Sequence, residues 1–345
     1  MTQRRLVFGI TYHGSTTRPF AGLDNVYGKH ISEARLQSHL EWIVGRFKVL
    51  PIREILQRSR EGRLSAGTAF LAFHDGYLGN YQVAFPLLMR LGIRADFCVT
   101  TSYIGTDRRF WVDILDAALK YTRAPSIRFE DERGVEILPL NGEAERIAAS
   151  YKIRRFLKAK PYADFEYHFN RILNEFGWES PAAVPRLGEH EACMDWRQIR
   201  EMSDAGMSIG SHTHRHTICV PQEDAVVREE MCLSKAMIER EIGVPCRVFC
   251  YPNGNYPQSG DDRTDRIAKE CGYESVLYMM SECNFVHPGT FRLTGLAFGE
   301  KTEVSQIRRS LSKFRIWKRK LSGRPLTPWI FDGVVDDSEV SRQKP

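Results

Sequence analysis

Short hydrophobic runs alternate with longer amphipathic segments along most of the chain. Runs that are rich in β-branched or aromatic residues and end in turn residues predict strands at 6–12, 47–50, 69–73, 94–99, 207–210, 247–251, 275–278 and 291–295. Apolar residues at helical spacing predict helices at 32–46, 81–91, 196–205, 223–242 and 264–271. Strands that alternate with helices are typical of an α/β protein with a parallel sheet, open or closed into a barrel.

Residues 107–193 interrupt this alternation. They are rich in helix formers, chiefly at 143–158 and 165–176, and only 126–138 has a strand pattern. We therefore expect a helical insertion, which either covers the site or forms an oligomer contact. The polar, acidic residues 333–345 predict a disordered tail, so that 1–332 form a single domain.

Composition and charge narrow the protein class. With 42% hydrophobic and 27% charged residues the chain of 345 residues is expected to fold, and it has no apolar run long enough to span a bilayer. The N-terminus lacks a signal-peptide pattern and the eight cysteines lack Cys-x-x-Cys spacing, so we expect reduced thiols and a cytoplasmic location. Residues 308–324 carry eight basic side chains and no acid. This tract is either a solvated terminal helix or a contact for an anionic membrane surface or substrate.

Unusual polar residues fall where predicted strands end. Asp75 follows the third strand, His212 follows the fifth, and His13 ends the first. The carboxyl ends of parallel strands meet at one edge, where α/β proteins carry their sites. A carboxylate and two imidazoles, here Asp75, His212 and His216, are the ligand set of a catalytic zinc ion that keeps one position open. Alternatively, Asp75 caps a turn and the two histidines belong to a polar surface loop.

A metal ion in such a site activates water and polarises a carbonyl group. The reaction also needs a base for the water proton and an acid for the leaving group. His74, beside the predicted ligand, and His13 are the candidates. Backbone N–H groups at 252–254 could stabilise the oxyanion.

Three segments resemble the motifs of the NodB-type polysaccharide deacetylases, carbohydrate esterase family 4. They are Ala-Phe-His-Asp-Gly-Tyr at 72–77, His-Thr-His-Arg-His at 212–216 and Phe-Cys-Tyr-Pro-Asn-Gly-Asn-Tyr at 249–256. The resemblance covers about 6–105 and 194–298. It implies a distorted (β/α)7 barrel and a divalent metal ion, with Zn²⁺ expected, on Asp75, His212 and His216. It also implies substrate contacts at the third motif, which we assign to Tyr251, Pro252 and Asn253.

The chain departs from the family pattern at its proton-transfer residues. His74 stands where the family has its catalytic aspartate, and it is either a neutral base, an added ligand or an inert replacement. The C-terminal segment that usually carries the acid is absent, and Leu-Thr-Gly at 293–295 takes its place. Residues 10–14, Ile-Thr-Tyr-His-Gly, are similar to that segment, as in circularly permuted members that carry this strand first. We therefore assign the acid to His13.

The resemblance implies a metal-dependent hydrolase that removes an N-acetyl or similar acyl group from an amino sugar. The substrate would be a glycan, or a lipid-linked or nucleotide-linked precursor in exopolysaccharide biosynthesis, and not a nucleic acid. The basic tract 308–324 could then give peripheral membrane contact. The alternatives are a C–N hydrolase of cyclic imides or ureides, and a catalytically altered glycan-binding protein.

Overall fold

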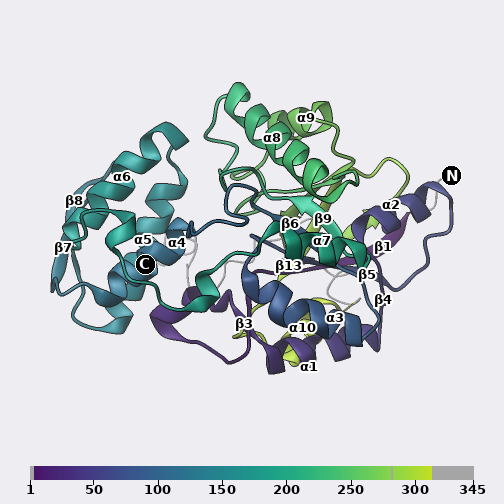
Figure 1. Cartoon of the computed structure of the whole chain (residues 1–345), viewed down its shortest axis with the longest axis horizontal. Helices are drawn as coiled ribbons and strands as arrows, with labels where there is room; N and C mark the ends of the chain where they lie inside the picture. Colours follow the sequence, from purple (N-terminus) through teal and green to yellow (C-terminus); the bar gives the residue numbers. More distant parts are fainter. Residues whose placement is uncertain (1–3, 281–282, 313–345) are drawn as a thin grey trace, which may run out of the picture.

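Seven parallel strands close into a barrel in the computed structural model, which describes residues 4–280 and 283–312 (Figure 1). Closure occurs where β1 pairs with β5 on one side and with β13 on the other, with Tyr12 opposite Phe73 and Ile10 opposite Leu296. The expected (β/α)7 barrel is therefore confirmed. In barrel order the strands are β1 (Arg5–Tyr12), β5 (Thr68–Phe73), β6 (Asp96–Val99), β9 (Ser208–Ser211), β10 (Val248–Cys250), β11 (Ser275–Met279) and β13 (Arg292–Ala297).

Alternate residues of these strands enter two separate hydrophobic clusters. One cluster contains Phe70 and Ala72 of β5, Val248 of β10 and Leu277 of β11, and it fills the barrel together with apolar residues of α2 (Ile52–Arg60). The other set, which includes Phe73 of β5, packs under the surrounding helices. Burial on both faces explains why these strands are continuous hydrophobic runs in the sequence.

Helices follow most of the barrel strands, as the hydrophobic pattern predicts. The predicted ones are α1 (Glu33–Val44), the π-helical turn Asn80–Ala84 with α3 (Phe85–Arg90), α7 (Trp196–Asp204), α8 (Asp224–Ile242) and α9 (Asp262–Glu270). The pattern missed α2 and α10 (Val304–Ser310). Smaller elements are β2 (Ser15–Thr16), β3 (Ile31–Ser32), β4 (Lys48–Val49), β12 (Asn284–Val286) and the 3₁₀ turns Gly22–Asp24, Val26–Gly28, Pro181–Ala183 and Glu189–Glu191.

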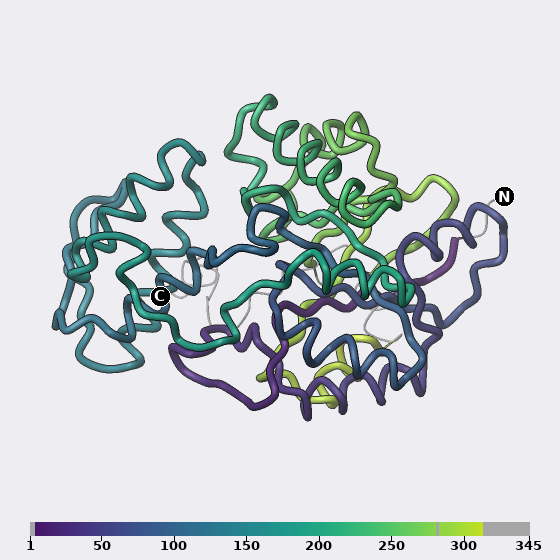
Figure 2. Tube along the Cα trace, viewed as in Figure 1, coloured from purple at the N-terminus to yellow at the C-terminus, as the bar shows by residue number. Residues whose placement is uncertain are grey.

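The insertion forms a lobe beside the barrel, drawn in blue to teal at the left of Figures 1 and 2. It has its own hydrophobic cluster, which also takes in Leu23 and Val26 from the loop after β2. The strand pattern predicted at 126–138 corresponds to two antiparallel strands that form a hairpin. The elements of the lobe are α4 (Trp111–Tyr121), β7 (Ser126–Asp131), β8 (Gly134–Pro139), α5 (Glu143–Lys158) and α6 (Tyr162–Glu175).

A buried ion pair connects the lobe to the loops of the barrel. Asp113 of α4 pairs with Lys29, and the two side chains are 3% and 10% exposed. The hydroxyl of Tyr77, which follows the motif at the end of β5, donates to Asp113 Oδ2 at 2.8 Å. A more exposed ion pair, Lys120 with Asp24, lies at the same junction. The lobe is thus fixed to the residues that lead away from Asp75.

Four of the eight cysteines form disulfide bonds, Cys98 with Cys250 and Cys232 with Cys271. The expectation of reduced thiols, which relied on the lack of an export signal, is wrong for these four. The cytoplasmic location stays a prediction. Among residues 4–280 and 283–312, no helix is both long and apolar enough to cross a membrane. The predicted tail 333–345 and most of the basic tract lie outside the described residues.

Candidate metal centre and the cavity beside it

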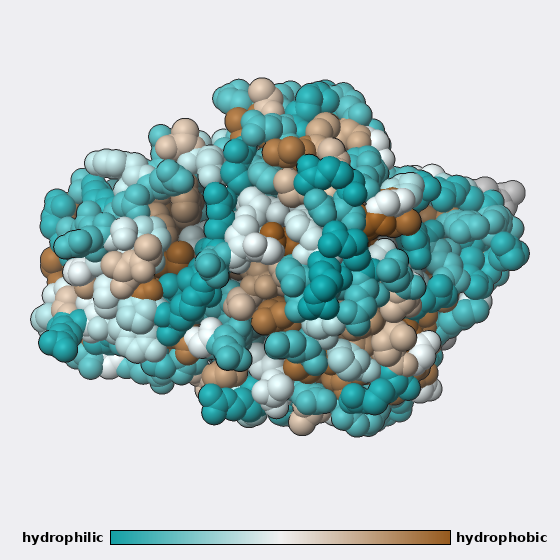
Figure 3. Space-filling view, in the orientation of Figure 1, coloured by the Kyte–Doolittle hydropathy of each residue, from teal (hydrophilic) through white to brown (hydrophobic). Residues whose placement is uncertain are grey.

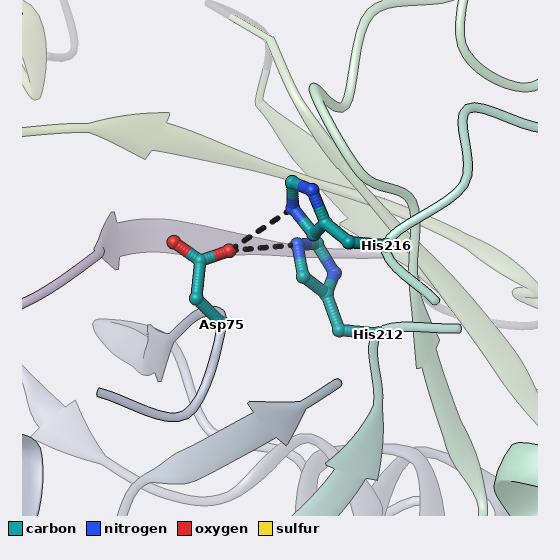
Figure 4. Close-up of side chains that lie close together, drawn as sticks. All are labelled: Asp75, His212 and His216. Atoms are coloured by element: carbon teal, nitrogen blue, oxygen red, sulfur yellow. Dashed lines mark ion pairs between the residues drawn. The ribbon is translucent and has the colours of Figure 1, made fainter. Parts of the chain in front are cut away.

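Asp75, His212 and His216 meet at the carboxyl-terminal end of the barrel, as predicted (Figure 4). Asp75 leaves β5 and the two histidines leave β9, which is separated from β5 by β6 alone. Asp75 Oδ1 lies 3.2 Å from Nε2 of His212 and 3.2 Å from Nε2 of His216. The three ligand atoms all lie within 4.8 Å of one another.

This geometry fits a small divalent ion. Bonds of about 2.0–2.2 Å in a tetrahedral site place neighbouring ligand atoms about 3.4 Å apart, close to the two observed distances. The Nδ1–H of His212 donates to the carbonyl oxygen of Cys250 at 2.8 Å, so in the neutral ring the lone pair of Nε2 points at Asp75. A lone pair facing a carboxylate oxygen is unfavourable without a cation between them. The hydrogen bond to Cys250 also fixes the ring, as outer partners of metal-bound histidines do.

Several residues of the site have backbone angles that side chains disfavour. Asp75 has φ 74°, His216 has φ 61° and Asn253 has φ 64°. Such angles cost energy in non-glycine residues and are concentrated at functional sites. Burial would raise the pKa of the Asp75 carboxyl, but in the site without a metal ion hydrogen bonds from His212 and His216 outweigh it and hold this pKa well below 3.8. Asp75 is therefore an anion, as a metal ligand must be.

His74 lies beside the three residues without being one of them. Its side chain is fully buried, and its ring centre lies 5.0 Å from that of His212. Neither ring nitrogen has a hydrogen-bond partner among the described residues. Burial, followed by the nearby rings of His212 and His13, holds the pKa of His74 well below 6.5, so the ring is neutral. A buried polar group without a protein partner needs a ligand, an ion or water.

His13 enters the same site from the end of β1. Its ring centre lies 5.6 Å from that of His74. Burial lowers the pKa of His13 to about 4, although Asp75 opposes the shift. The side chain is partly exposed, unlike that of His74. The structure thus brings together all five residues that the sequence analysis assigned to metal binding or proton transfer.

The three residues assigned to substrate contacts in the third motif differ in burial and in hydrogen-bond partners. The side chain of Tyr251 is fully buried, and its hydroxyl donates to Asp265 Oδ1 at 2.8 Å, so it faces α9. Pro252 is buried. Asn253 is partly exposed, and its Oδ1 accepts from Lys158 Nζ at 2.5 Å. Of the three predicted substrate contacts, Asn253 alone bonds to a residue that lines the cavity described next.

A cavity of about 540 Å³ lies between the insertion lobe and the barrel, and His216 is part of its wall. In Figure 3 a furrow with hydrophobic residues in it separates the two parts. Aromatic side chains give the cavity an apolar surface, while basic ones add positive charge. They include Tyr103, Trp111, Tyr162, Phe165 and Phe169, and Arg108, Arg109, Lys158, Lys160 and Arg215. The insertion thus forms one side of a binding space next to the candidate metal ligands.

Sequence reasoning missed this cavity and Lys158 at the end of α5. The chain carries no local signal for either. Lys158 follows Leu157 at the end of an ordinary amphipathic helix, and it reaches the barrel only because the lobe folds back.

The family model described as polysaccharide deacetylase matches residues 161–276. The match includes both predicted histidine ligands and the third motif. No curated protein matches the chain.

Solved deacetylase structures share the fold at low sequence identity. The Streptococcus pyogenes deacetylase PplD, in complex with acetate, is 15% identical with a TM-score of 0.56, over 90% of this chain and 100% of that one. A de-N-acetylase from Aggregatibacter actinomycetemcomitans is 18% identical with a TM-score of 0.54, covering 90% and 100%. IcaB from Ammonifex degensii is 16% identical with a TM-score of 0.53, covering 88% and 97%. These similarities describe the fold.

Proposed function

We propose that the chain is a metal-dependent hydrolase that removes an N-acetyl or similar acyl group from an amino sugar, because the polysaccharide deacetylase model matches residues 161–276 and solved deacetylases share its fold. The observation that supports this most is the placement of Asp75, His212 and His216 within 4.8 Å of one another beside a cavity. The acylated sugar belongs to a glycan or a glycan precursor. Zn²⁺ is the proposed ion, since two imidazoles and one carboxylate are a ligand set that suits it.

The proposed division of labour keeps the metal ligands apart from the proton carriers. The bound ion would activate a water molecule and polarise the acyl carbonyl group. His74, neutral and without a protein partner, accepts the water proton. His13, on the partly exposed side, delivers a proton to the nitrogen of the leaving amine. Because burial keeps His13 neutral near pH 7, the proton that it delivers is the one that His74 has taken from the water and passed to the neighbouring His13 ring. The acid-bearing strand at the N-terminus, as in circularly permuted members, stays a prediction.

Asn253 and the backbone around it form the side of the site that faces the lobe. Asn253 has a left-handed backbone angle, and its side chain accepts a hydrogen bond from Lys158. We propose that backbone N–H groups of 252–254 donate to the oxygen of the acyl group. Aromatic residues of the cavity, Trp111 and Tyr162 among them, offer flat faces against which sugar rings pack.

Acetate release from N-acetylated chitooligosaccharides tests the proposal. Loss of one ligand through Asp75→Asn or His216→Ala is expected to lower the rate about 100-fold or more, because even partners outside the ligand shell contribute 10–100-fold. His287→Ala is the matched control, since His287 lies on the barrel away from the three ligands and should leave the rate unchanged. Metal binding without turnover on any acylated sugar would instead support a glycan-binding protein.

A further inference from the structure

Lys158 is a basic residue in the cavity wall that no carboxylate neutralises among the described residues. Its ammonium group donates to the neutral amide oxygen of Asn253 at 2.5 Å. Three other basic residues of the wall have acidic partners. Arg109 pairs with Glu191, Lys160 with Glu132 and Arg215 with Glu230. Lys158 is basic like these neighbours, but its partner is a neutral amide and theirs are carboxylates.

This arrangement is unfavourable in the absence of a ligand. Lys158 is partly buried, and the neutral amide oxygen that it contacts leaves most of the charge of its ammonium group uncompensated. Burial, with a smaller contribution from Arg154 one turn earlier on α5, lowers the pKa of Lys158 to about 7. Phe156 and Leu157, the residues before Lys158, are buried apolar residues. An apolar side chain at 158 would therefore suit its surroundings and would avoid the free-energy cost of placing an ammonium group there. An anion that enters the cavity would supply the missing partner.

Two basic residues of the wall are available to such an anion. Arg109, Lys160 and Arg215 have the carboxylate partners named above, which leaves Lys158 and Arg108 among the basic residues of the lining. Arg108 is exposed at the same lining and has no ion pair among those described. His216, a candidate metal ligand, belongs to this wall, so an anion on Lys158 would share one cavity with the acyl group.

We infer that Lys158 forms a subsite for an oxyanion, a phosphate or a carboxylate, that the substrate carries next to its N-acylated sugar. The identity of the sugar in this inference rests on the proposed function. The binding of the anion does not. An ammonium group accepts either oxyanion as a point charge. Hydrogen bonds between charged groups are roughly twice as strong as neutral ones.

Calorimetric titration of the chelator-treated full chain separates binding from turnover. The ligands are triacetylchitotriose, its 1-phosphate and its aldonic acid, which differ only in charge at one end. We expect the native protein to bind at least one charged form about 10- to 100-fold more tightly than the neutral trisaccharide. Lys158→Met should abolish that preference and leave the affinity for the neutral form unchanged. Lys152→Met, which removes the same charge from the same helix outside the cavity lining, should keep the preference.

Three results would overturn the inference. They are equal affinity of the native protein for all forms, a preference that survives in Lys158→Met, and an equal loss of affinity for charged and neutral forms. Acetate release from the same ligands by the zinc-loaded protein reports the proposed function separately. If the charge preference depends on Lys158 but no acetate is released, the subsite stands and the deacetylase proposal fails. If acetate is released but the native protein shows no charge preference, the deacetylase proposal stands and the subsite fails.

Discussion

Substitution of Asp113 by asparagine should destabilise the protein strongly, because it leaves the charge of Lys29 buried and unpaired. The Lys29 side chain is 10% exposed and that of Asp113 is 3% exposed, so water cannot replace the lost partner easily. Removal of one member of a buried ion pair costs about 3–5 kcal/mol. The introduced amide can still accept from the hydroxyl of Tyr77, so the charge is the main loss.

The free energy of unfolding in urea, followed by tryptophan fluorescence, measures this effect. Lys29→Met combined with Asp113→Asn removes both charges, and it should recover most of the loss because no uncompensated charge remains. Lys120→Met is the control at the same junction. It breaks the ion pair with Asp24, whose partners are 34% and 31% exposed, and should cost less than about 1 kcal/mol. A loss below about 1 kcal/mol for Asp113→Asn, or a double variant as unstable as the single one, would refute the reasoning.

Three further predictions concern single residues. Burial raises the pKa of Asp96 from 3.8 to about 7, so between these values the unfolded chain has released a proton that the folded chain keeps. Stability should therefore fall as the pH rises from 4 to 7, by about 1.4 kcal/mol per unit at most, and Asp96→Asn should remove this part of the fall in urea unfolding at pH 5 and pH 8. A slope that persists unchanged in the variant would contradict the assignment. His74→Ala should lower acetate release about 10²- to 10⁴-fold at equal zinc content if His74 is the base, and an unchanged rate would exclude that role. Gly79→Ala should destabilise the chain, since a Cβ there would lie 1.7 Å from the carbonyl oxygen of Ser15. Thermal unfolding of the variant at the same temperature as the native protein would show that this contact is relieved.

The strands and the positions of the candidate metal ligands could be predicted because both depend on local sequence. A buried parallel strand is hydrophobic along its length, and all eight predicted strands have a counterpart in β1, β4, β5, β6, β9, β10, β11 and β13. Once these strands are parallel, Asp75 and His212 must lie at the same end. The short helix α2 was not predicted. Its apolar residues pack into the hydrophobic cluster that fills the barrel, and the sequence does not reveal this contact.

The cavity, the subsite and the cysteine pairs depend on tertiary contacts. Lys158 meets Asn253 across 95 residues, and Cys98 meets Cys250 across 152. No periodicity encodes such separations. The motif order could indicate that the insertion lies near the site, but not that α5 faces His216. The roles of His74 and His13 stay predictions, since the structure gives their positions and surroundings only.

Zinc titration of the chelator-treated protein, with acetate release from an N-acetylated chitooligosaccharide as the readout, tests whether deacetylation depends on one bound metal ion. We expect no release without metal, a rate that rises in proportion to added zinc, and a break at about one zinc ion per chain, as three ligands around one ion require. The same titration of Asp75→Asn should stay near the baseline. Release of acetate at the full rate from the metal-free protein, or none from the zinc-loaded protein on any acylated amino sugar, would contradict this expectation.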